Sequence, residues 1–98
     1  MDKQHFFLKL NPPRTTFMMD MTADEKAIMQ KHVVYWNGLL NENIAIVFGP
    51  VMDPNGGYGA GVVSVDNEQH LLQIIANDPA NGLNQYEYYP MRAVYKKA

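Results

Sequence analysis

Four short apolar runs alternate with two amphipathic stretches in this chain, and their order constrains the fold more than any other feature. The apolar runs are rich in the β-branched and aromatic residues that favour strands, and they lie at residues 6–10, 44–48, 59–65 and 85–95. The amphipathic stretches lie at residues 23–41 and 67–77. This order predicts an α+β domain of ferredoxin-like β-α-β-β-α-β type. Two helices would cover one face of a four-stranded antiparallel sheet.

Both predicted helices carry start signals. Thr22 to Glu25 reads Thr-Ala-Asp-Glu, the pattern of a capping box. After it, an apolar stripe at helical spacing contains Ile28, His32, Trp36 and Leu39. Asp66 or Asn67 is expected to cap the second helix. Its core-facing residues are predicted to be Leu71, Leu72, Ile74 and Ile75. The intervening residues 12–21 are predicted to be a loop.

The predicted strands are apolar on both faces. In the first strand Phe6, Leu8 and Leu10 alternate with His5, Phe7 and Lys9. In the second, Ile44, Ile46 and Phe48 are expected to oppose Ala45 and Val47, and in the last, Tyr86, Tyr88 and Val94 to oppose Tyr89, Met91 and Tyr95. Pro90 lacks a ladder donor, which predicts an edge or bulged strand. Because monomers rarely expose large apolar faces, we expect two copies to pair through their sheets as a homodimer.

Composition narrows the functional classes. The chain has 98 residues, 47% hydrophobic and 18% charged, which predicts one domain over residues 1–98. A net charge of −2 offers no basic field for nucleic acid. We expect no membrane partner either, because no apolar run approaches the ~20 residues of a membrane helix. The chain has no cysteine and no apolar leader, which fits a cytoplasmic protein.

His32 and Asp78 are the residues that most invite a chemical role. His32 is an ionisable group within an apolar helical stripe, although a lone histidine there is more often a core residue. Asp78, followed by Pro79, is typical of a helix end. An aspartate there meets the negative end of the helix dipole, however, and favours a cation or donor beside it. A histidine is one candidate for that neighbour.

Other residues suggest a ligand site. Gly49-Pro50 and the turn Asp53–Gly57 would let backbone approach a ligand, although hairpin turns use the same residues. Trp36 and Tyr58 are candidates to line a cleft, and Arg14 to pair with a carboxylate. No histidine pair has metal-ligand spacing and no cofactor fingerprint is present, so we predict neither metal nor cofactor.

These motifs, taken in order, resemble the YciI-like (YCII-related) family. The resemblance comprises His32 with the leucine-rich stretch and apolar strand that lead to Gly49-Pro50, then Asp78-Pro79, then the closing stretch Tyr88–Arg92. It spans nearly the whole chain. Asn43 departs from the pattern, since it stands where the family often has glycine. The loop with Gly56, Gly57 and Tyr58 departs too, where related chains often place a polar group.

The resemblance implies a dimeric α+β barrel similar to muconolactone isomerase, and a catalytic His–Asp pair that maps onto His32 and Asp78. It suggests a cofactor-independent isomerase or lyase, one family branch being related to a chloromuconolactone dehalogenase. Its substrate would be a small carbonyl or lactone compound. Two alternatives stay open: a non-catalytic module for small-ligand binding or oligomerisation, and an oxygenase without a bound cofactor.

Overall fold

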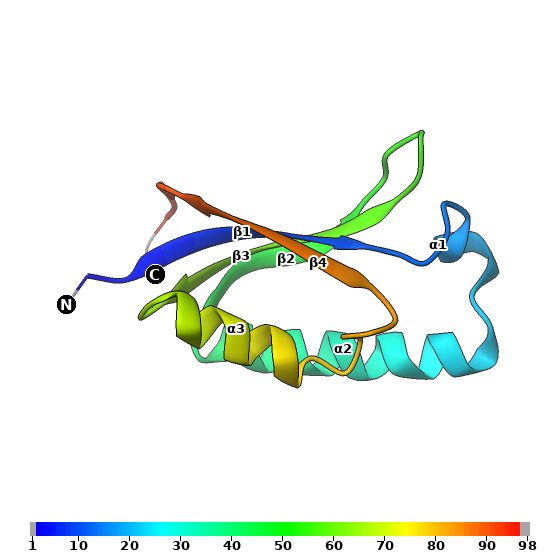
Figure 1. The fold of residues 1–98 in the computed structure, drawn as a ribbon, viewed down its shortest axis with the longest axis horizontal. Helices are drawn as coiled ribbons and strands as arrows, with labels where there is room; N and C mark the ends of the chain where they lie inside the picture. The colour runs from blue at the N-terminus through cyan, green and yellow to red at the C-terminus, as the bar shows by residue number, and fades with distance from the viewer. Residues whose placement is uncertain (1, 97–98) are drawn as a thin grey trace.

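The computed structural model describes residues 2–96, which form an α+β structure with three helices and a four-stranded antiparallel sheet (Figure 1). The elements in chain order are β1 (Gln4–Asn11), α1 (Phe17–Asp20), α2 (Ala23–Asn41), β2 (Ala45–Val51), β3 (Tyr58–Val65), α3 (Glu68–Asn77) and β4 (Gln85–Met91). Their order along the chain is compatible with a ferredoxin-like arrangement.

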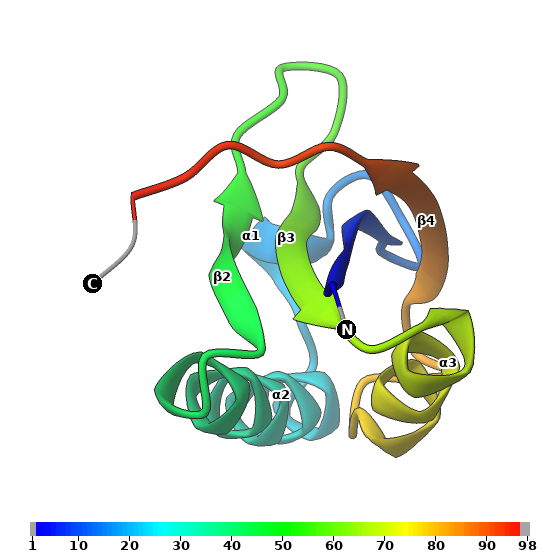
Figure 2. The same ribbon diagram turned by 90° about the vertical axis from the view of Figure 1, so that its left-hand side faces the viewer.

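The sheet has the strand order β2-β3-β1-β4, with every neighbouring pair antiparallel. α2 and α3 lie on the same face of this sheet, whereas the short α1 lies at one end of it (Figures 1 and 2). β4 is an edge strand, as Pro90 predicted. Proline has no backbone N–H to donate, and an edge strand tolerates this because it has a neighbouring strand on one side only. The site described below lies in the layer between α2 and the sheet.

α2 begins and ends where the sequence indicates. Thr22 and Glu25 form the full capping box. The backbone N–H of Glu25 donates to the Thr22 hydroxyl over 3.1 Å, and the backbone N–H of Thr22 donates to the Glu25 carboxylate over 2.8 Å. The helix ends at Asn41, and Asn43 follows in the left-handed region with φ 62°. Asparagine tolerates this conformation better than most residues do, which suits it to the position just after the helix end.

The core fills the space between the helices and the sheet. Trp36 of α2 is only 1% exposed, and its six-membered ring lies over Gly61 of β3. A Cβ atom at Gly61 would stand 3.0 Å from that ring, so a side chain there would push the indole away. The core residues that surround this contact come from both layers and are Phe6, Leu8, Leu10, Leu39, Ala45, Val63, Val65, Leu71 and Ile74.

Two sequence predictions about regular structure prove wrong. Residues 12–21 are not all loop, since α1 forms within them and buries Phe17 to 3% exposure. The last strand ends at Met91 and not at 95, and Val94 is fully exposed. The reason is the register: Met91 pairs with His5, and β1 begins only one residue earlier at Gln4, so β1 is too short to pair with a strand that continues to residue 95.

Two further predictions fail, namely that Ala45 and Val47 share one face of β2 and that Leu72 faces the core. Ala45 is buried while Val47 is 55% exposed, because the register between β2 and β3 shifts at this point and lets Ile46 bulge out of the alternation. In α3, Leu71 and Ile74 are buried as expected, but Leu72 is 45% exposed. Leu71 and Ile74 are three residues apart and so share one face of the helix. Leu72, one residue after Leu71, points to a different side.

Candidate active site

His32 and Asp78 meet inside the molecule although 46 positions separate them. His32 lies in the middle of α2, and Asp78 caps the C-terminal end of α3. The Nδ1 atom of His32 is 2.9 Å from both carboxylate oxygens of Asp78. The carboxylate is fully buried, whereas 11% of the imidazole remains exposed. The pair is therefore enclosed on the aspartate side and open only at the histidine.

The carboxylate of Asp78 accepts hydrogen bonds from four groups. Besides His32, the indole Nε1–H of Trp36 donates to it over 2.9 Å, and the backbone N–H of Ala80 over 2.8 Å. The hydroxyl of Tyr86 donates the fourth bond. Burial acts to raise the pKa of Asp78, but the bonds from His32, Tyr86, Ala80 and Trp36 outweigh it and hold the pKa below its ordinary value.

This environment fixes the chemistry of the imidazole. An ionised carboxylate can only accept hydrogen bonds, so Nδ1 of His32 must carry the proton that faces Asp78. In the neutral ring the other nitrogen, Nε2, is then unprotonated and can accept a proton. The arrangement matches the orienting half of a general-base dyad, in which the carboxylate sets the tautomer and stabilises the charged ring.

Two tyrosines support the pair from α2 and β4. Burial, followed by the hydrogen bond to Asp78, raises the pKa of Tyr86 far above its ordinary value, so its hydroxyl stays a donor. Burial and the charge of Asp78 also raise the pKa of Tyr35 to about 12. Tyr35 donates to the carbonyl of Ile74 over 2.7 Å, which ties α2 to the last turn of α3. Both tyrosines thus act as positioning residues, and neither is poised to ionise.

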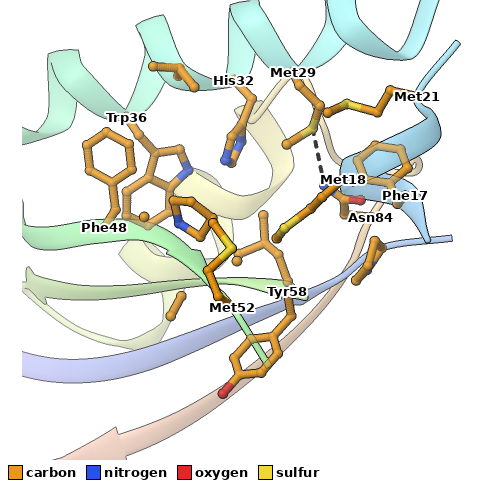
Figure 3. Close-up of a pocket in the computed structure, with 17 residues that line it drawn as sticks. Phe17, Met18, Met21, Met29, His32, Trp36, Phe48, Met52, Tyr58 and Asn84 are labelled. Carbon is orange, nitrogen blue, oxygen red and sulfur yellow. Dashed lines mark hydrogen bonds between the residues drawn. The ribbon is translucent and has the colours of Figure 1, made fainter. Parts of the chain in front are cut away.

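His32 forms part of the wall of a pocket of about 370 Å³ between α2, the sheet and the α1 segment (Figure 3). The other residues of the wall are mostly apolar, with four methionines among them. They are Leu10, Pro12, Phe17, Met18, Met21, Met29, Val33, Trp36, Phe48, Gly49, Pro50, Met52, Tyr58, Gly59, Ala60 and Asn84. A concave apolar site with few polar groups is the usual form of a small-molecule pocket.

The structure brings most of the sequence-predicted site residues together. Trp36, Gly49, Pro50 and Tyr58 line the pocket beside His32, while Asp78 lies behind the imidazole and outside the lining. The hydroxyl of Tyr58 points away from the pocket in Figure 3, so its ring forms the wall.

Arg14 lies elsewhere. Its guanidinium makes a bidentate bond to Glu25, with distances of 2.9 and 2.8 Å, and a 2.8 Å bond to Asp20. Those contacts tie the α1 segment to the start of α2, and Arg14 is not among the residues that line the pocket.

Sequence reasoning missed Tyr86 and Asn84. The alternation in β4 grouped Tyr86 with Tyr88 on one face of the strand, but nothing in the pattern shows that the Tyr86 hydroxyl reaches Asp78. Asn84 precedes β4 in a polar segment, where asparagine is expected to be exposed, yet it is only 4% exposed. Its burial depends on how residues 78–84 fold back against α2, which no local pattern specifies.

Comparisons with known proteins leave the site to be interpreted from its own geometry. The chain matches no protein-family model and no curated protein. Within residues 2–96, no three histidine or carboxylate side chains gather as a metal site requires, and no helix has the length and apolar character needed to cross a bilayer. What the fold and site define is a small α+β protein with a buried His–Asp pair at the wall of an apolar pocket.

Proposed function

We propose that this chain is a YciI-like protein that acts as a cofactor-independent isomerase or lyase on a small carbonyl or lactone compound. The observation that carries the proposal is the contact between His32 and Asp78 at the wall of the pocket. The carboxylate holds the proton on Nδ1, which leaves Nε2 as the base that a pocket ligand meets. The family resemblance of the motifs supports the same two residues.

In the proposed reaction, Nε2 of His32 removes a proton from a carbon next to the carbonyl group. The electron pair of that C–H bond moves toward the carbonyl and forms an enolate. The imidazolium then returns the proton at another carbon, which completes an isomerisation. Alternatively, the enolate expels a leaving group from the β carbon together with the electrons of that bond, and the imidazolium passes its proton to the departing group or to water, which completes an elimination. Throughout, the negative charge of Asp78 stabilises the imidazolium at a distance of 2.9 Å.

Hydrogen–deuterium exchange tests the first step without knowledge of the full reaction. A panel of small ketones and lactones would be incubated with the protein in D₂O, and loss of the proton next to the carbonyl would be followed by ¹H NMR. We expect wild-type protein to accelerate exchange for at least one compound. His32→Gln should reduce that acceleration by about 10²–10⁴-fold. His5→Gln, which changes a histidine outside the pocket lining, should retain it.

A second candidate function is non-catalytic binding, which the apolar lining of the pocket favours. Such a module would hold a small apolar ligand through the methionines and aromatic rings, and His32 would be only a structural contact. It predicts saturable binding that His32→Gln leaves unchanged, with no exchange activity in any protein. The exchange experiment therefore separates the two functions.

We further propose that the protein acts as a homodimer that pairs through the open face of its sheet, as in a dimeric α+β barrel. A row of apolar side chains crosses this face in register: Val47 on β2, Val62 on β3, Phe7 on β1 and Tyr89 on β4. The helices lie on the opposite face, and Val47 and Tyr89 are half exposed. Covering this row against a second copy would remove apolar surface from water.

A further inference from the structure

Glycines stand at alternate positions where β3 begins, namely Gly57, Gly59 and Gly61. Gly59 pairs directly with the buried Leu10 of β1, and directly paired residues of antiparallel strands place their side chains on the same face. Because successive side chains of a strand alternate between its two faces, Gly61 faces the same way as Gly59. This stretch therefore presents bare backbone to the layer between the sheet and α2.

Side chains from other elements cover the first and the last of these glycines. The six-membered ring of Trp36 lies over Gly61, where an added Cβ atom would stand 3.0 Å from it. The side chain of Met18, from α1, lies over Gly57, where an added Cβ atom would stand 2.5 Å from the Sδ atom. Each of these two side chains fills the space that a glycine leaves.

Gly59, the middle glycine, is not covered in this way. The three atoms nearest to an added Cβ atom there all belong to Leu10 of the same sheet, the closest at 3.2 Å. Gly61 is buried, whereas Gly59 is partly exposed and lines the pocket. The missing side chain of Gly59 therefore opens a slot in the floor of the pocket, with Trp36 at one end and Met18 at the other.

His32 lies over this slot. α2 and β3 run in the same direction, because β2 returns from the end of α2 and pairs antiparallel with β3 (Figure 1). His32 precedes Trp36 by four residues, about 6 Å along a helix, and Gly59 precedes Gly61 by two residues, about 6–7 Å along a strand. Since Trp36 lies over Gly61, the same spacing brings His32 over Gly59. Figure 3 shows the His32 ring pointing from α2 toward the sheet, with Trp36 on one side and Met18 on the other.

The wall of the pocket carries no fixed charge that could hold an ionised ligand. Among residues 2–96, the lining contains no Asp, Glu, Lys or Arg. Arg14, the cation that the sequence suggested for a carboxylate, is bound to Asp20 and Glu25. The carboxylate of Asp78 is fully buried behind His32. A charged ligand would lose its hydration in this pocket without meeting an opposite charge, which is unfavourable.

We infer that Gly59 is a specificity-determining residue, whose missing side chain admits the flat ring of a neutral cyclic ketone or lactone beneath His32. A flat ring fits because bare backbone forms the floor of the slot and the indole of Trp36 forms one of its ends. The pocket volume of about 370 Å³ is near the lower end for small-molecule sites, which favours one or two rings. The inference rests on the proposed function in taking this pocket as the substrate site, and it narrows the substrate class.

Three matched probes test the preference for a flat and neutral ligand. 2-Indanone is a flat, neutral ketone with two fused rings, 2-adamantanone is a neutral ketone of similar size but globular shape, and indane-2-carboxylate places a negative charge on the indane ring system. Binding would be followed by NMR through the indole N–H resonance of Trp36, which is unique because the chain has one tryptophan. Since a ligand of the wrong shape must displace packed side chains, 2-indanone should bind roughly 5-fold or more tightly than 2-adamantanone, with the carboxylate weakest.

Gly59→Ala is the decisive variant, because it adds one methyl group to the floor of the slot. It should weaken the binding of 2-indanone by roughly 10-fold or more, whereas cyclopentanone, a single ring, should bind almost as before. The ratio of these two affinities is the readout, since partial unfolding caused by the close contact with Leu10 would weaken both ligands by the same factor.

Gly38→Ala is the matched control. It adds the same methyl group to a glycine of α2 that does not line the pocket, at a position where a Cβ atom would meet nothing within 4 Å. The ratio of affinities for 2-indanone and cyclopentanone should therefore equal that of wild-type protein.

Several results would overturn the inference: no shift of the indole resonance with any probe, equal or tighter binding of 2-adamantanone, or tighter binding of the carboxylate. A ratio for 2-indanone and cyclopentanone that is the same in Gly59→Ala as in wild-type protein would overturn it too. Failure of the proposed chemistry gives a different result. In that case the preference for 2-indanone and its loss in Gly59→Ala persist, while wild-type protein fails to accelerate hydrogen–deuterium exchange.

Discussion

The Nδ1 atom of His32 lies 2.9 Å from each carboxylate oxygen of Asp78, which stands at the C-terminal end of α3. The end of a helix is an unfavourable place for a negative charge, because the last carbonyl groups point toward it. Here four donors surround the carboxylate and compensate for both the dipole and the burial. Asp78 holds the imidazole of His32 in one orientation, and part of that ring stays exposed. Together these two features make the pair suitable for proton transfer.

Asp78→Asn tests how strongly this cluster holds the fold together. Asparagine has an NH₂ group in place of one carboxylate oxygen. At least one of the four groups that donate to Asp78 would therefore lose its acceptor. We expect the free energy of unfolding to fall by about 2–4 kcal/mol. Urea denaturation measures it. Asp66→Asn, which removes an exposed partner of Lys3, should cost under about 1 kcal/mol, and an equal cost at both positions would contradict the account.

Gly61→Ala tests whether the close approach of Trp36 to the sheet matters. The added Cβ would stand 3.0 and 3.1 Å from two ring carbons, and it would displace the indole that donates to Asp78. We expect a loss of about 1–3 kcal/mol in stability and a shifted indole resonance. Gly49→Ala on the neighbouring strand is the control, because its Cβ would meet nothing within 4 Å. Similar effects of the two substitutions would rule out the steric explanation.

Acid stability should depend on the contact between Arg14 and Glu25. The hydrogen bonds from Arg14, then from the backbone of Thr22, lower the pKa of Glu25 from 4.5 to about 2. Because the folded state lowers this pKa, the stabilisation is complete above about pH 4.5 and is lost as the pH falls toward 2. Arg14→Met should therefore flatten the fall in urea midpoint across this range. A curve parallel to that of wild-type protein would show that the contact adds nothing.

The proposed dimer can be broken on the open face of the sheet. Val62→Lys would place a charge in the middle of the apolar row, which should convert a two-chain species into single chains at micromolar concentration. Val34→Lys is the matched control, since Val34 is 71% exposed on α2 and away from the sheet face. Sedimentation equilibrium distinguishes these states. A wild-type mass equal to one chain would contradict the proposed dimer.

Local signals in the sequence predicted much of the fold. The capping box and the closing asparagines placed α2 at 23–41, because each end of that helix is specified by its own side chains. The shift between Ala45 and Val47 was missed, since a bulge is chosen by the pairing of two strands and not by either one alone. The same reason explains the early end of β4: its length depends on where β1 begins.

The candidate site was predictable only in part. His32 and Asp78 drew attention as an ionisable group in an apolar stripe and an acid at a helix end, and the family resemblance linked them. The donors that make Asp78 a stable carboxylate come from three separate segments, namely Trp36 on α2, Ala80 in the loop and Tyr86 on β4. Such a convergence is a property of the packed molecule, and no spacing along the chain encodes it.

The most direct test of the central claim is the tautomer of His32, observed by long-range ¹H–¹⁵N NMR at mildly alkaline pH. If Asp78 holds the ring as described, Nδ1 will show the shift of a protonated nitrogen and Nε2 that of an unprotonated one. His70 provides an internal control of the opposite tautomer, because its Nδ1 accepts from the backbone N–H of Asp66 over 3.2 Å. A proton on Nε2 of His32 in wild-type protein would contradict the assignment of this residue as the base.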